Sequence, residues 1–210
     1  MRISDNVYAL KSTKGAYAFV IKDKEITLID TGFKWIGKRL LKELQKIGVK
    51  PKDIKNILLT HHDVDHIGNV AILQRLSDAA VWASKEDIPY LKGELKRPGI
   101  KKIFTAMSRL KKLDNIQQYR QDQKFGDISI VPTPGHTPGH VCILYKDCLF
   151  VGDLVKNKNG KLIAYPNLNW DVSKLKESIG KVAHLPFKWV CVAHGEPIER
   201  GMQWEEMLNQ

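Results

Sequence analysis

A buried strand that runs directly into a polar loop constrains this chain more than any other feature. The apolar run from Ile54 to Leu59 predicts a buried strand, and Thr60 to Gly68 follow it without a break. Five of these nine loop residues carry imidazoles or carboxylates: His61, His62, Asp63, Asp65 and His66. Such groups side by side bury poorly if all are charged, and a divalent cation compensates them. The loop therefore predicts a metal site.

Metal-binding residue types follow predicted strands at three later places. His136 and His140 lie in the segment 133–140, Asp153 follows a strand over 148–151, and His194 follows a strand that ends at Val192. One histidine at a strand end is more often satisfied within the protein than bound to a metal. Four such signals, each at the carboxyl end of a strand beside small residues, favour a shared site.

The order of the predicted elements indicates a layered α/β fold. Short strands open the chain, and an amphipathic helix over 34–47 ends at Gly48. The strand and polar loop come next, then a helix over 67–76, a strand over 79–83 and a short helix that begins near a Ser84 cap. The second half repeats this logic, with a helix capped by Asp171 and a final helix from Pro197 onward. We expect two mixed sheets face to face with helices outside.

Residues 92–115 interrupt this pattern and are strongly basic. Six lysines and two arginines surround apolar residues that recur at helical spacing: Ile103, Phe104, Met107, Leu110 and Leu113. One interpretation is an inserted amphipathic helix that packs on the domain. The other is a lid or substrate wall that binds a partner or a lipid-like group.

Length and composition limit the domain organisation, the binding partners and the location that this chain can have. A chain of 210 residues suits a single domain over 1–210 that carries the insertion at about 92–115. The net charge of +11 allows anionic substrates or nucleic acid, but the lysines are spread along the chain. No apolar run approaches the roughly 18 residues of a membrane span, and no signal peptide is evident, so we expect a cytoplasmic protein. Cys142, Cys148 and Cys191 lie in predicted strands, which favours buried thiols.

The ordered set of motifs resembles the metallo-β-lactamase superfamily. The resemblance rests on Leu28–Gly32, the histidine-rich loop, Pro134-Gly135-His136-Thr137-Pro138-Gly139-His140, Gly152-Asp153 and Ala193-His194-Gly195. It extends from Asp30 to Gly195 and implies a four-layer αββα sandwich with a site for one or two metal ions.

The resemblance also assigns the ligands by position. It implies a first metal ion held by His61, Asp63 and His136, and a second held by Asp65, His66 and His194. It implies that Asp153 bridges the two ions. It implies supporting roles outside the ligand set for Asp30, which would orient a ligand histidine, and for His140. We expect His62 to be a neighbour of the ligands or a pocket-lining residue.

One position departs from the superfamily pattern, which is His-x-His-x-Asp-His. Here the second histidine is replaced, giving His61-x-Asp63-x-Asp65-His66, and His62 lies one residue away. In an extended loop His62 would point to the other side, so we expect Asp63 to be the ligand. We expect zinc, with iron or manganese as alternatives because Asp63 adds a hard oxygen ligand. Flavodiiron members of the superfamily also place an acid here and bind iron, but they depend on a flavodoxin-like module.

The expected activity is metal-dependent hydrolysis of a small-molecule ester, thioester or lactone, with an anionic substrate as one option. A metal-bound hydroxide, generated at the centre that includes Asp65 and His66, is the expected nucleophile. The tentative pocket walls are Ile103, Phe104, Met107 and Tyr165. Two alternatives remain: a nuclease or phosphodiesterase that uses the basic insertion, and a non-hydrolytic di-iron redox or binding module. The sequence does not specify the oligomeric state.

Overall fold

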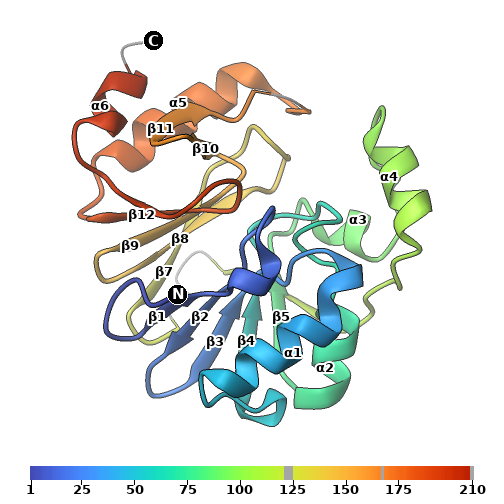
Figure 1. Ribbon diagram of the computed structural model, residues 1–210. Helices are drawn as coiled ribbons and strands as arrows, with labels where there is room; N and C mark the ends of the chain where they lie inside the picture. The colour runs from blue at the N-terminus through green and yellow to red at the C-terminus, as the bar shows by residue number, and fades with distance from the viewer. Residues whose placement is uncertain (121–124, 167, 209–210) are drawn as a thin grey trace. The chain divides into compact units, whose positions relative to one another are not determined.

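A computed structural model describes residues 1–120, 125–166 and 168–208, and divides the chain into two compact units, Met1–Gln118 and Tyr119–Gln210 (Figure 1). Each unit contains one large mixed sheet with helices, which confirms the predicted mixed α/β class with two mixed sheets. In the described part of the chain, no helix has the length and apolar character needed to cross a membrane.

The first unit is built on a six-stranded sheet in the order β1-β2-β3-β4-β5-β6. Its strands are β1 (Val7–Ala9), β2 (Phe19–Lys22), β3 (Ile26–Ile29), β4 (Ile54–Leu58), β5 (Ala80–Ala83) and β6 (Ile116–Gln118). The first three strands pair antiparallel, while β3, β4, β5 and β6 pair parallel. The carboxyl ends of β3, β4 and β5 therefore lie at one edge of the sheet, and the polar loop follows β4 at that edge.

Helices of the first unit are α1 (Gly37–Lys46), α2 (Val70–Ser77), α3 (Ile88–Leu91) and α4 (Lys101–Ser108), with 3₁₀ turns η1 (Lys11–Thr13), η2 (Lys34–Ile36) and η3 (Pro51–Asp53). Helices α1 and α2 lie against the sheet in Figure 1 and bury an apolar stripe. Leu40 and Leu44 of α1 share a core with Leu73 of α2 and with Leu28 and Ile57 of the sheet. This burial is the main stabilising term for both helices.

The second unit contains a five-stranded sheet in the order β13-β12-β9-β8-β7 and a separate β10-β11 ribbon. Its strands are β7 (Ile128–Pro132), β8 (Val141–Tyr145), β9 (Cys148–Gly152), β10 (Val155–Lys158), β11 (Lys161–Ala164), β12 (Trp189–Val192) and β13 (Ile198–Glu199). Helices α5 (Val172–Ala183) and α6 (Gln203–Leu208) pack on this sheet. Because β9 and β12 run parallel and two antiparallel pairings align β7 with them, all three end at one edge.

Of three predictions about where helices begin, one is confirmed and two are wrong. The Asp171 cap of α5 is confirmed, since its Oδ1 accepts the backbone N–H of Lys174 at 3.0 Å. The cap predicted at Ser84 is wrong, because residues 85–87 form turns and α3 begins only after Asp87. The helix predicted from Pro197 onward is also wrong at its start, because Ile198 pairs with β12 as part of β13 and α6 begins at Gln203.

The basic insertion forms a shorter helix than its apolar spacing indicates. Helix α4 ends at Ser108, because Arg109 adopts a left-handed conformation with φ of 46°. Leu113 returns to the core of the first unit, and Leu110 packs against it. The apolar repeat therefore combines a short helix with two anchoring side chains beyond it.

The predicted role of the cysteines is confirmed. Cys142, Cys148 and Cys191 are buried thiols on β8, β9 and β12. Burial raises the pKa of Cys142 to about 12, with a hydrogen bond from Thr133 acting in the opposite direction. Burial also raises the pKa of Cys191, which keeps this thiol protonated at neutral pH.

Candidate metal centre

The polar loop after β4 is held in place by its own backbone and by β3. His66 and Ile67 donate backbone N–H groups to the carbonyl of Asp63 at 3.0 and 3.2 Å, which turns the loop back on itself. Thr31 donates its backbone N–H to the carbonyl of His66 at 2.7 Å. Gly68 then passes so close to the segment after β3 that an added Cβ would collide with the amide nitrogen of Lys34. Only glycine fits this crossing.

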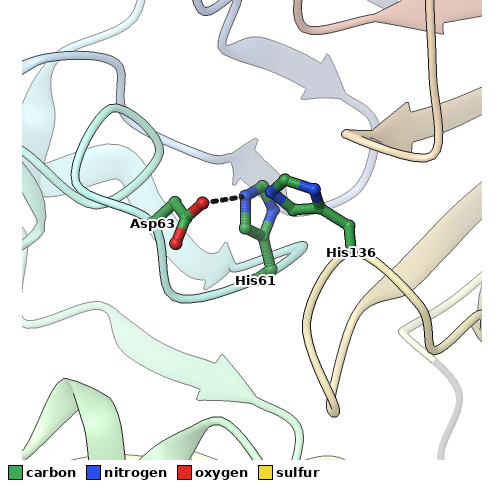
Figure 2. A group of neighbouring side chains, drawn as sticks. All are labelled: His61, Asp63 and His136. Carbon is green, nitrogen blue, oxygen red and sulfur yellow. Dashed lines mark ion pairs between the residues drawn. The ribbon is translucent and has the colours of Figure 1, made fainter. Parts of the chain in front are cut away.

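His61 and Asp63 point toward each other across this turn. Figure 2 shows both side chains on the loop that follows β4, and His136 on the loop that follows β7. The distance between His61 Nε2 and Asp63 Oδ2 is 3.8 Å. The Nδ1 of His61 lies 3.0 Å from the hydroxyl oxygen of Thr60. Nε2 is therefore the ring nitrogen that can bind a metal ion together with Asp63.

Asp30 orients His66 from the end of β3. Its Oδ2 lies 2.8 Å from Nδ1 of His66, and it also accepts the Thr60 hydroxyl at 2.7 Å. Its Oδ1 accepts the backbone N–H of Thr60 at 2.9 Å. The structure thus places Asp30 behind His66, with the His66 Nε2 on the side of Asp65, 3.9 Å from that carboxylate.

His62 turns away from the other loop histidines. Its ring stacks on Tyr90 with centroids 4.3 Å apart, and its backbone N–H donates to Asp87 Oδ2 at 3.0 Å. The Nδ1 of His62 also lies 3.0 Å from the same Asp87 oxygen. Sequence reasoning missed Asp87 and Tyr90 because nothing in the α3 region marks them as partners of the loop.

Two cations of the basic insertion reach the loop as well. The Nζ of Lys101, at the start of α4, lies 2.6 Å from Asp63 Oδ2. Arg97 is buried and donates from Nη2 to the carbonyl oxygen of His62. Burial lowers the pKa of Arg97, while the charges of Asp63, Asp87 and Asp65 act in the opposite direction. These contacts were not predicted from the sequence, which indicated a packed helix or a lid for this region.

The second unit brings together His136, Asp153 and His194 at the ends of β7, β9 and β12. One carboxylate oxygen of Asp153 lies 3.4 Å from His136 Nε2, and the other lies 3.2 Å from His194 Nε2. Asp153 therefore presents one oxygen to each histidine. His136 is fixed by Asn169, whose Oδ1 lies 2.9 Å from Nδ1. Asn169 was not predicted, because an asparagine in a loop carries no spacing signal.

His140 supports Asp153 from behind. Its Nδ1 lies 2.9 Å from the Thr133 hydroxyl, and its Nε2 accepts the backbone N–H of Asp153 at 3.1 Å. Both ring nitrogens are thus used within the protein. The ring of Tyr165 lies beside both ligand candidates, with centroids 4.9 Å from His136 and 5.3 Å from His194.

The three apolar residues predicted as pocket walls on α4 are exposed. The exposed fractions of Ile103, Phe104 and Met107 are 57%, 46% and 74%. They lie on the same short helix as the buried Lys101. Their role as substrate contacts stays a prediction.

The donor chemistry of both units fits divalent metal ions. Hydrogen-bond partners hold Nδ1 of His61, His66 and His136, so each presents Nε2 as the candidate ligand nitrogen. Carboxylate oxygens accompany these nitrogens in both units. The sets of three or more residues that could hold an ion include all seven predicted ligands: His61, Asp63, Asp65, His66, His136, Asp153 and His194.

Comparison with known proteins agrees with this chemistry. The sequence profile described as the metallo-beta-lactamase superfamily matches residues 13–194. The chain belongs to the metallo-β-lactamase superfamily. A probable metallo-hydrolase of Methanocaldococcus jannaschii is 30% identical over 161 residues, which cover 75% of this chain and 66% of that protein. A probable metallo-hydrolase of Bacillus subtilis is 26% identical over 188 residues, covering 87% and 81%. The chain is a metallo-hydrolase of this superfamily.

Solved structures of the superfamily share the fold. A metallo-beta-lactamase superfamily protein of Sulfolobus tokodaii gives a TM-score of 0.77 at 22% identity and covers 99% of this chain and 86% of its own. A metallo-beta-lactamase family protein of Thermus thermophilus gives 0.78 at 22% identity, with 99% and 80% covered. At this identity the likeness establishes the fold, and the substrate needs separate evidence.

Proposed function

We propose that the chain binds two divalent metal ions and hydrolyses a small-molecule ester, thioester or lactone. The observation that carries the proposal is the position of Asp153, which offers a separate oxygen to His136 and to His194. A carboxylate with this geometry suits a ligand shared by two cations. The donor pairs in the first unit, His61 with Asp63 and His66 with Asp65, supply complementary ligand types.

The proposed ligand assignment follows the superfamily order. His61, Asp63 and His136 bind one ion, Asp65, His66 and His194 bind the other, and Asp153 bridges them. Zinc is the proposed metal, and iron or manganese are alternatives because three carboxylates make the donor set hard. When bound, such ions lower the pKa of a water molecule to roughly 7, which supplies a nucleophile, and they polarise the bond to be broken.

The protein residues around the ligands fix their orientation. Asp30 holds His66 directly, and it accepts the hydroxyl of Thr60, which in turn contacts His61. Asn169 and His140 hold His136 and the backbone of Asp153 in the second unit. These contacts restrict the rotations of the ligand side chains, which reduces the cost of ordering them on binding.

A thioester is the substrate class with specific support among relatives. A protein of Shewanella baltica named hydroxyacylglutathione hydrolase is 34% identical over 100 residues, which cover 48% of this chain and 33% of that protein. The match covers less than half of this chain and a third of that protein, so the reaction class is a better supported proposal than the glutathione moiety.

A phosphodiesterase remains the second candidate because of the basic insertion. Buried Arg97 and Lys101 contact the loop, so part of the positive charge of this segment is used in contacts inside the protein. If nucleic acid is the substrate, binding should weaken steeply between low and moderate salt. Salt-independent or absent binding removes this candidate. The other alternative, a non-hydrolytic di-iron redox or binding module, requires bound iron and a flavin partner. Metal analysis of the purified protein that finds no iron removes it.

The test of the proposal is chelation followed by addition of single metals. Protein stripped of metal is assayed against thioester, ester, lactone and phosphodiester substrates, before and after addition of zinc, manganese or iron. We expect no hydrolysis by the stripped protein and restored hydrolysis of a thioester, ester or lactone. Hydrolysis that survives complete metal removal, or no hydrolysis of any substrate with any metal, contradicts the proposal.

We further propose that residues 1–210 form one domain and that the protein is cytoplasmic.

A further inference from the structure

Helix α4 places the ammonium group of a lysine against the proposed metal-binding loop. Lys101, its first residue, is 8% exposed, and its Nζ lies 2.6 Å from Asp63 Oδ2. The Asp63 carboxylate is itself 11% exposed. Lysine is rarely buried without a partner. The Coulomb attraction between two poorly solvated charges is stronger than that of a surface ion pair, while removal of both charges from water opposes it.

Lys101 contacts the carboxylate oxygen that a metal ion at His61 would need. Asp63 Oδ2 lies 3.8 Å from His61 Nε2, while Asp63 Oδ1 lies 3.8 Å from Nε2 of His62 on the other side. Ligand atoms on one metal ion, each about 2.0–2.2 Å from it, lie roughly 3–3.5 Å apart. The Oδ2 atom is therefore close to a ligand position, and it is the atom that Lys101 holds.

We propose that Lys101 competes with the metal ion for Asp63 and so weakens metal binding at the set of His61 and Asp63. This inference rests on the proposed function, in which Asp63 is a ligand. The ammonium group must leave Oδ2, or share it, when a divalent cation binds there. Repulsion between the two cations and loss of the ion pair both oppose metal binding. The protein then binds its two ions with unequal affinity, and Lys101 sets the difference.

Arg97 does not play the same part. Its Nη2 donates to the backbone carbonyl of His62. The Arg97 charge interacts with Asp63, Asp87 and Asp65, so it acts on several carboxylates together. Lys101 instead makes a direct contact with one proposed ligand atom, which makes it the residue to change.

The first experiment compares Lys101→Met with the matched control Lys102→Met. Lys102 is the next residue of α4 and is exposed. Metal-free whole protein is titrated with zinc in the presence of a competing chelator, and with cobalt followed by visible absorption. We expect Lys101→Met to tighten the weaker binding step by about tenfold to a hundredfold. The control should change it by less than about twofold, because solvent and salt screen exposed charges.

A second pair of variants shows whether the effect passes through Asp63. In an Asp63→Asn background, Lys101→Met should no longer tighten the weaker step, because the contested carboxylate is gone. Thermal unfolding of each metal-free variant confirms that it is folded. Lys101→Gln, which removes the charge and keeps a polar end, replaces Lys101→Met if that variant does not fold.

The outcomes separate this inference from the proposed function. Unchanged or weaker binding in Lys101→Met, an equal gain in Lys102→Met, or a gain that persists with Asp63→Asn overturns the role of Lys101 alone. If the unaltered protein binds no metal ion in these titrations, both the proposed function and this inference fail.

Discussion

Asp30 Oδ2 lies 2.8 Å from His66 Nδ1, and the same oxygen accepts the Thr60 hydroxyl at 2.7 Å. Thr60 can then accept a hydrogen bond from Nδ1 of His61, 3.0 Å away. One carboxylate at the end of β3 thus orients two ligand candidates, one directly and one through Thr60. Both rings are thereby held with Nε2 as the metal-binding nitrogen.

Replacing Asp30 should weaken metal binding without removing a ligand. In Asp30→Ala, His66 loses the carboxylate 2.8 Å from its Nδ1, and the backbone and hydroxyl of Thr60 lose their acceptor. We expect metal affinity to fall by about 10- to 100-fold, as for other residues that orient ligands. Zinc titration against a chelator measures this. Unchanged affinity in folded Asp30→Ala would contradict the orienting role.

Thr60 should affect metal binding less than Asp30 does, and through its hydroxyl. Thr60→Val keeps the side-chain shape but removes the link between Asp30 and His61. We expect an affinity loss of roughly tenfold, with recovery in Thr60→Ser, because serine restores the hydroxyl. The same titration provides the comparison. If the valine and serine variants behave alike, the hydroxyl is not the orienting group.

The order of strands and loops was readable from the sequence because the polar residues follow apolar runs. His61 follows the buried strand β4 of the first unit. In the second unit Asp153 and His194 follow β9 and β12, which pair parallel and so end at the same edge of their sheet. The superfamily resemblance supplied the ligand assignment that spacing alone left open. The predicted fold class and superfamily are confirmed.

The supporting residues could not be predicted for a physical reason. Tyr90, Asn169 and Lys101 act through contacts with residues far away in the sequence, and single polar residues in turns or short helices have no periodic signature. Lys101 and Lys102 are adjacent identical residues, yet one is buried against Asp63 and the other is exposed. Only the path of α4 distinguishes them.

Asn169 should contribute to metal binding through His136. Its Oδ1 lies 2.9 Å from His136 Nδ1, and its Nδ2 donates to the carbonyl of Tyr165 at 2.8 Å. Asn169→Ala removes the acceptor, so we expect metal affinity to fall by about tenfold or more. Asn169→Asp retains an acceptor and should recover most of the loss. An alanine variant that binds metal normally would show that His136 needs no such partner.

The buried cysteines should resist alkylation in the native protein. Burial raises the pKa of Cys142 to about 12 and raises that of Cys191, so at pH 8 both remain neutral thiols. Because the thiolate is the reactive form, iodoacetamide should modify them slowly until denaturant exposes them. Mass spectrometry of peptides from native and denatured protein tests this. Rapid modification of Cys142 in the native state at pH 8 would contradict its burial.

The most direct test of the metal centre is the number of ions per chain in the unaltered protein and in Asp153→Ala. Asp153 lies between His136 and His194 with one oxygen toward each. Removal of its carboxylate should therefore lower the affinity for both ions of the proposed centre, while the protein stays folded. After equilibration with zinc and removal of excess metal, we predict that the unaltered protein retains two ions and that folded Asp153→Ala retains fewer. Equal metal content in the two proteins would contradict the account.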